Sequence, residues 1–130
     1  MQETIDIGTP VQLMQFIEDG ALVVGTTGTG KSYLLRVIEE RIATAHVQQI
    51  IFDPEGEFST LRERFNFALC SSEGEIPLNV EYAEVLATKI FEMNISVIFD
   101  LYELAPADQR IFVKRFLTAL MAIPKRLWHP

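Results

Sequence analysis

The sequence has few of the features that mark secreted, membrane or disulfide-rich proteins. It contains a single cysteine, Cys70, so no disulfide can form within the chain. No apolar run reaches the roughly 18 residues that a membrane-spanning helix needs. The N-terminus carries acids rather than a basic segment followed by an apolar stretch, so it does not resemble a secretory signal. A lone thiol fits a reducing compartment, and we therefore expect a cytoplasmic protein with no membrane partner.

The sequence also lacks the surplus of basic residues that is typical of nucleic-acid binders. Its formal net charge is −7. Residues 1–100 hold six Lys or Arg against sixteen Asp or Glu, a net charge of −10, whereas residues 101–130 hold five against two, a net charge of +3. Because phosphate contacts supply much of the affinity for nucleic acids, any DNA contact is expected from the basic C-terminal end, from an assembled ring or from parts outside this chain.

What the sequence does contain is an alternation of strands and helices. Apolar runs predict four strands, at residues 21–25, 47–53, 67–71 and 95–100. Apolar residues three and four apart predict a helix after residue 31, through Leu34, Leu35, Ile38 and Ile42. A second helix is predicted from Asn79 to about Met93. A third is predicted from Pro106, with an apolar stripe of Ile111, Phe112, Phe116, Leu120 and Ile123. Shorter helical turns are expected within residues 11–17 and from Ser59 or Thr60, and a loop at 71–79. This order predicts one α/β domain over residues 1–130, with a mostly parallel sheet covered by helices on both faces.

A glycine-rich segment joins the first predicted strand to the first predicted helix. It matches the phosphate-loop pattern G-x-x-x-x-G-K-[ST] at every fixed position, with the residues Gly25, Thr26, Thr27, Gly28, Thr29, Gly30, Lys31 and Ser32. Glycine keeps Cβ atoms away from a bound phosphate, so that backbone N–H groups at the helix N-terminus can converge on its oxygens. In such a loop Lys31 would contact the β- and γ-phosphates and the Ser32 hydroxyl would bind Mg²⁺. The alternative is a glycine-rich turn that binds nothing.

Two predicted strands end in aspartate, at Asp53 and Asp100. Ligands of parallel α/β sheets bind at the carboxyl ends of strands, so both acids are candidates for a functional edge. Asp53 is followed closely by Glu55 and Glu57. Asp53 or Glu57 would then lie near the γ-phosphate of a nucleotide or near a neighbouring subunit; the alternative is a solvated acidic turn that caps a short helix. For Asp100 the alternative is a turn at the end of its strand.

Other residues with reactive or recognition chemistry have simpler interpretations. His46 and His129 are isolated, and no metal-ligand spacing surrounds either of them. Cys70 has no neighbouring base in the sequence and is expected to be an inert packing residue. Trp128 stands near Lys125 and Arg126 and could stack on a base, but packing is the simpler expectation.

Three stretches resemble the HerA–FtsK class of P-loop ATPases, and most closely the HerA-like helicase and translocase domain. The segment GTTGTGKS resembles the phosphate loop of that family, DPEGEF resembles its Asp-Pro-x-Gly-Glu-aromatic signature, and SVIFDLYELAPADQRIFVKRFLTAL resembles a later strand and helix. The phosphate loop is shared by all P-loop proteins, whereas the second motif is much more specific. The similarity covers residues from about 5 to 130.

This resemblance implies a RecA-like P-loop NTPase fold with three layers, a hexameric ring and DNA translocation driven by ATP and Mg²⁺. Residues 25–32 carry over as nucleotide-binding, and Asp53 and Glu57 carry over as signature positions. Lys31, Asp53 and Glu57 are the candidate catalytic residues. In the family a strand ending in Asp-Glu would follow Pro130, and an arginine finger would come later. We therefore expect the chain to be the N-terminal part of a longer ATPase domain, with little or no ATP turnover of its own.

Two other functions remain open from the sequence. One is a different P-loop NTPase or a small kinase, although no Arg-rich insertion suggests the lid that such kinases use. The other is a nucleotide-binding assembly module without turnover.

Overall fold

The computed structural model describes residues 4–8, 10–15, 31–72 and 74–127, which fall into two compact units, residues 1–49 and 50–130. The predicted strand at 21–25 and residues 25–30 of the glycine-rich loop lie outside the described residues. Within the part of the chain that the structure describes, no helix has the length and apolar character to cross a membrane.

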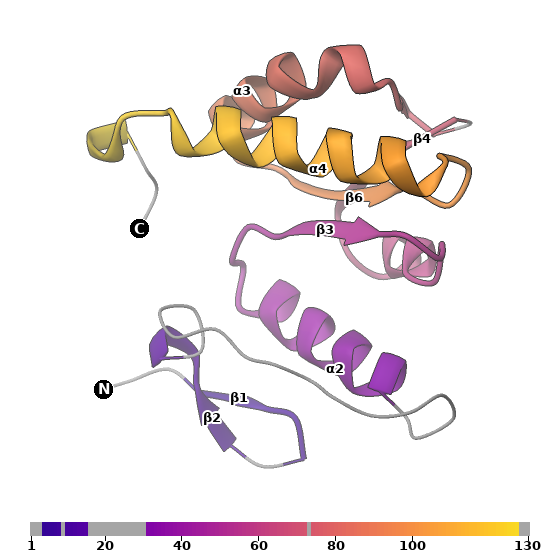
Figure 1. Cartoon of the computed structure of the whole chain (residues 1–130). Coiled ribbons are helices and arrows are strands. Elements are labelled where there is room, and N and C mark those ends of the chain that lie inside the picture. Colours follow the sequence, from indigo (N-terminus) through magenta and orange to yellow (C-terminus); the bar gives the residue numbers. More distant parts are fainter. Residues whose placement is uncertain (1–3, 9, 16–30, 73, 128–130) are drawn as a thin grey trace. The chain divides into compact units, whose positions relative to one another are not determined.

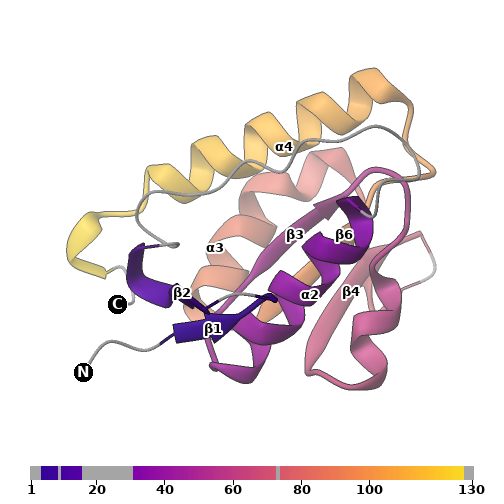
Figure 2. The same ribbon diagram turned by 90° about the horizontal axis from the view of Figure 1, so that it is seen from below.

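The first unit contains a small antiparallel hairpin and one helix. Strand β1 (Thr4–Asp6) pairs with β2 (Pro10–Gln12), and helix α2 spans Lys31–Thr44. β1 lies beside α2 in Figure 2. The helix has the predicted apolar spacing, and Ile38 and Ile42 are buried against Ile5 and Leu13. The prediction of helical turns across residues 11–17 was wrong at its start, because residues 10–12 form β2; three-residue strands are too short to show a periodicity.

The second unit is built on a sheet of four parallel strands. The strands are β3 (Ile50–Asp53), β4 (Phe67–Ser71), β5 (Ile76–Pro77) and β6 (Ser96–Asp100), in the order β3-β6-β4-β5. The predicted α/β class with a parallel sheet is confirmed. The loop predicted at 71–79 instead contains β5, which the sequence could not indicate because it has two residues, one of them a proline.

Helices α3 (Ala83–Met93) and α4 (Pro106–Met121) lie side by side over one face of this sheet, as Figure 1 shows. The contact of α4 with the sheet is aromatic: the ring centroid of Phe99 on β6 lies 5.1 Å from that of Phe112 and 5.0 Å from that of Phe116, and all three side chains are fully buried. The predicted stripe on α4 is confirmed at Phe112 and Phe116. It was wrong at Ile111, which is 45% exposed.

Short 3₁₀ helices complete the second unit, at Ser59–Glu63 (η1), Val80–Tyr82 (η2) and Lys125–Leu127 (η3). Asn79 is an N-cap as predicted, since its side-chain oxygen accepts a hydrogen bond of 2.9 Å from the Glu81 N–H; the first turn it caps is the 3₁₀ helix η2, and α3 follows. Asn94 ends α3 in the left-handed conformation, which asparagine tolerates better than most residues.

Candidate functional site

Lys31 and Ser32, the last two residues of the phosphate-loop motif, are the first two residues of α2. Gly25, Thr26, Thr27, Gly28, Thr29 and Gly30 lie outside the described residues. The first turn of α2 contains no acidic residue, whereas α3 and α4 carry Glu84 and Asp108 in theirs. No side chain of this turn therefore neutralises the positive end of the α2 dipole, which suits the binding of an anion.

The two strand-end acids are neighbours in the sheet of the second unit. Asp53 on β3 is the register partner of Asp100 on β6, at the carboxyl ends of both strands. The Leu101 N–H donates a hydrogen bond of 2.9 Å to the Asp53 carbonyl oxygen, which extends the pairing one residue beyond the strands. The sequence predicted that two acids would stand at this edge, and the structure brings them side by side.

The side chain of Asp53 holds the segment that follows it. Only 1% of Asp53 is exposed, and its Oδ2 accepts a hydrogen bond of 2.9 Å from the Phe58 N–H. Phe58 is the residue that precedes η1. The carboxylate therefore closes the Asp-Pro-Glu-Gly-Glu-Phe segment into a compact loop. The alternative of a solvated acidic turn that caps a short helix does not describe Asp53, because this residue is buried and bonds the residue before η1. A catalytic role for Asp53 stays a prediction.

Gly56 explains why this loop contains a glycine. Its φ is +71°, in the left-handed region that other residues adopt only with strain, and a Cβ at this position would lie 3.4 Å from Asp100 Oδ1. The loop therefore passes close to Asp100. Asp100 Oδ1 also accepts a hydrogen bond of 3.1 Å from the Tyr102 N–H, the turn role that the sequence left open for it.

Glu57, the third predicted catalytic residue, is exposed on the same loop, as is Glu55. Neither carboxylate has an ion pair or hydrogen bond within the described residues, so both face solvent. The described residues contain no group of three or more His, Cys, Asp or Glu side chains that could hold a metal ion, so any Mg²⁺ needs further ligands such as phosphate oxygens and water.

Sequence reasoning missed several polar residues around Asp100. Ser59, Ser71, Ser72, Tyr102 and Glu103 line a cavity together with Asp100 and Leu69. The signal was present in Ser71 and Ser72 at the end of the strand at 67–71, because residues at that position reach the same edge as the strand-end acids.

Cys70 is an inert core residue, as predicted. It is fully buried, its Sγ lies 3.7 Å from the Pro77 carbonyl oxygen, and burial raises the pKa of its thiol to about 12. His46 follows the end of α2 with a φ of 60° and is exposed. Trp128 and His129 lie outside the described residues.

Comparison with known protein families identifies the family of this chain. Residues 3–128 match the family described as the central domain of the helicase HerA. The chain belongs to the HerA central-domain family. Comparisons with curated proteins and with solved structures gave no match. Membership of the HerA family indicates a function of the ATPase or helicase type, with a nucleotide and Mg²⁺ as the expected ligands.

Proposed function

We propose that this HerA-family chain is the ATP-binding part of a DNA helicase or translocase in which ATP hydrolysis in an oligomeric ring drives the movement of DNA. The observation that carries the proposal is the complete phosphate-loop motif, whose Lys31 and Ser32 open a 14-residue helix with no acid in its first turn. The family match over residues 3–128 supports the same conclusion.

Each residue of the motif has a role that follows from its chemistry. The glycines and threonines at 25–30 offer backbone N–H groups to phosphate oxygens, as the N-terminus of α2 does. Lys31 adds a full positive charge for the β- and γ-phosphates, and the Ser32 hydroxyl is a hard oxygen ligand for Mg²⁺. When bound, ATP would supply the phosphoryl group whose transfer drives the motor, and Mg²⁺ would neutralise the charge on its phosphate oxygens.

The acids of the loop after β3 are assigned different roles. Asp53 accepts the Phe58 N–H and so positions the loop. Glu57 is exposed on that loop, and we assign it to the orientation of water at the γ-phosphate or to contact with a neighbouring subunit. We therefore assign Lys31 to direct contact with the phosphates, Glu57 to one of these two roles, and Asp53 to an indirect role through the loop.

DNA binding is proposed for the assembled protein rather than for this chain alone. The net charge of −10 on residues 1–100 repels a polyanion, and the +3 on residues 101–130 offers only a few phosphate contacts. A ring repeats those few charges around its pore, which a single chain cannot do.

A nucleotide-binding module without turnover is the second candidate. The burial of Asp53 favours this candidate, because only 1% of the residue is exposed and its carboxylate already accepts a backbone hydrogen bond. An acid held in this way is poorly placed to polarise water. On this alternative, nucleotide binding regulates assembly, and phosphate release requires residues outside this chain.

The test is calorimetric titration of the chain with ADP and Mg²⁺. Lys31→Ala should weaken binding roughly tenfold or more, because a charged hydrogen bond to phosphate contributes about 1.5–3 kcal/mol. Lys89→Ala is the matched control, since Lys89 is an exposed lysine whose nearest acid, Glu92, lies 3.9 Å away. Equal affinity of the Lys31 variant and the parent would refute the proposal.

A second assay separates the two candidates. Phosphate release from ATP is measured for the chain and for the Lys31→Ala variant. Steady release that the substitution abolishes would support a motor with catalytic residues inside this chain. Nucleotide binding without release would favour the module, or a motor completed by further residues.

A further inference from the structure

A cavity of about 320 Å³ lies at the carboxyl ends of β4 and β6, within the second unit. Its walls come from η1, from the end of β4 and from the turn after β6, and the lining residues are Ser59, Leu69, Ser71, Ser72, Asp100, Tyr102 and Glu103. One water molecule occupies about 30 Å³ in the liquid, so the space is large enough for an organic group.

The wall of this cavity accepts hydrogen bonds and carries negative charge. Asp100 and Glu103 contribute two carboxylates, and the described residues that line the cavity include no lysine, arginine or histidine. The Ser72 hydroxyl donates a hydrogen bond of 2.5 Å to Glu103 Oε2, which fixes that carboxylate at the wall. Tyr102 is 69% exposed and lines the cavity beside these acids, so its ring is accessible to a ligand.

Ser71 gives independent support for a ligand at this position. Only 8% of the residue is exposed, it lines the cavity, and its hydroxyl makes no hydrogen bond within the described residues. The hydroxyl oxygen itself is not fully buried, so it reaches the space of the cavity and can bond a ligand there. The backbone packs closely here, since a Cβ on Gly74 would lie 2.8 Å from Ser71 Oγ and 2.6 Å from the Leu69 carbonyl oxygen.

The lining excludes two other classes of ligand. A phosphate or carboxylate would meet two carboxylates and no cation, so an anion is repelled. A bare metal ion needs more protein ligands than this wall provides, since no group of three or more His, Cys, Asp or Glu side chains occurs among the described residues. An organic cation with several N–H donors matches both the negative charge and the hydrogen-bond acceptors of the wall.

We propose that this cavity binds a guanidinium group. A guanidinium is planar, carries five N–H donors, pairs with carboxylates and stacks on aromatic rings, which matches the carboxylates, hydroxyls and tyrosine ring of the wall. An arginine side chain of a polypeptide and a free guanidino compound share this chemistry. The argument for this site uses only the lining of the cavity, so a negative result here would not affect the proposed ATPase function.

The test is an amide NMR titration of the ¹⁵N-labelled 130-residue chain with two guanidinium probes. Agmatine represents a free guanidino compound, and N-acetyl-arginine methylamide represents a side chain in a polypeptide. The matching citrulline derivative is the neutral control, because it keeps the shape and loses the charge. The site predicts saturable shifts at Ser71, Ser72, Tyr102 and Glu103 with a guanidinium probe, and none with the citrulline derivative.

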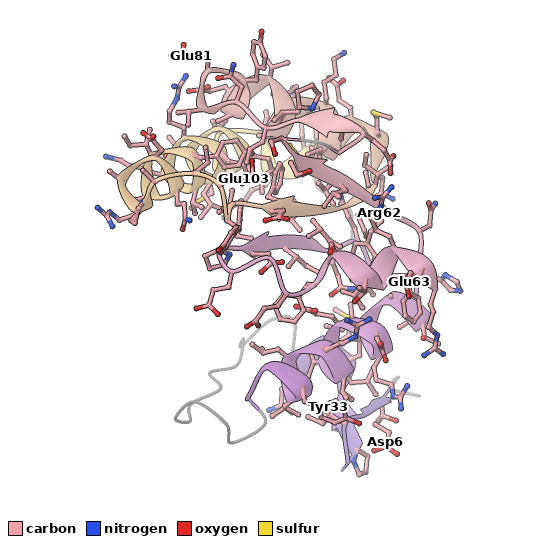
Figure 3. The ribbon with its side chains drawn as sticks, turned by 90° about the vertical axis from the view of Figure 1, so that its right-hand side faces the viewer. Asp6, Tyr33, Arg62, Glu63, Glu81 and Glu103 are labelled. Carbon is pink, nitrogen blue, oxygen red and sulfur yellow. The ribbon has the colours of Figure 1, made fainter. Side chains whose placement is uncertain are left out.

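Three variants connect the binding to the cavity. Glu103→Gln should raise the Kd about threefold, the effect expected for one partly exposed ion pair. Ser71→Ala should also weaken binding, yet its Tm should stay unchanged or rise, because the hydroxyl has no partner to lose. Glu63→Gln is the matched control: Glu63 is an exposed acid on η1 that lies apart from Glu103 in Figure 3, and its Kd should equal that of the parent.

Each outcome has a clear meaning. Saturable binding of either guanidinium probe, weakened by Glu103→Gln but not by Glu63→Gln, supports the site; binding of only one probe also identifies the source of the group. Absence of shifts with both probes would overturn the proposal, as would equal binding of the citrulline derivative. A fall in Tm with Ser71→Ala and no change in Kd would show that the serine is purely structural, which also contradicts the proposal.

Discussion

The buried carboxylate of Asp53 offers the sharpest test of how the acidic loop is held. In Asp53→Ala the Phe58 N–H loses its acceptor, which lies 2.9 Å away on a side chain that is 1% exposed. A hydrogen bond to a charged group contributes about 1.5–3 kcal/mol, so we expect the free energy of unfolding to fall by about 2 kcal/mol. With a Tm change of about 4 °C for each kcal/mol in a domain of this size, the Tm should fall by roughly 8 °C.

The assay is thermal unfolding followed by far-UV circular dichroism, with two companion variants. Asp53→Asn keeps an oxygen that can accept the Phe58 N–H, so it should lose roughly half as much. Glu55→Ala removes an exposed acid from the same loop and should leave the Tm within about 1 °C. An Asp53→Ala variant as stable as the Glu55→Ala control would refute the structural role, and would return Asp53 to the candidates for direct catalysis.

Three further predictions concern Gly56, Cys70 and the Glu84–Arg115 pair. Gly56→Ala should destabilise the chain by about 1 kcal/mol in urea unfolding. A Cβ has room at this position, but alanine is strained at a φ of +71°. An unchanged urea midpoint would contradict this conformational argument. Burial raises the pKa of the Cys70 thiol from 9.0 to about 12, so the contribution of the protonated thiol to stability is complete below pH 9 and is lost as the pH rises from 9 towards 12. Cys70 of the native chain should react with a thiol reagent at pH 8 far more slowly than Cys70 of the chain in urea. Equal rates would contradict its burial. The hydrogen bonds of 2.7 and 2.8 Å from Arg115 lower the pKa of Glu84 below 4.5, so the pair stabilises the fold above that pH and loses its effect as the pH falls further. Glu84→Gln should flatten this acidic part of the curve of stability against pH. An unaltered curve would show that the pair contributes nothing to stability.

The features that the sequence predicted correctly depend on local patterns. The helix from Lys31 to Thr44 follows from apolar residues three and four apart, and the strands ending at Asp53 and Asp100 follow from apolar runs that stop at an acid. These patterns also located the edge of the sheet where the signature loop begins. They required no knowledge of which elements touch.

The features that the sequence did not reveal depend on contacts between distant segments or on very short elements. The hairpin of β1 and β2 and the two-residue β5 are too short to leave a periodic pattern. The hydrogen bond from the Phe58 N–H to Asp53 and the position of Ser71 in the wall of a cavity are consequences of how the loop and the strands fold around one another. Ile111 fits the apolar stripe of α4 in the sequence, but the helix turns it towards solvent.

The central claim is that residues 25–32 bind the phosphates of a nucleotide, and an amide NMR titration with ADP and Mg²⁺ tests it most directly. Adenosine is the matched probe, because it keeps the base and ribose and lacks the phosphates. The account predicts large, saturable shifts of the amide signals of residues 25–32 with ADP and little change there with adenosine. Unchanged signals from these residues at saturating ADP, or equal shifts with adenosine, would contradict it.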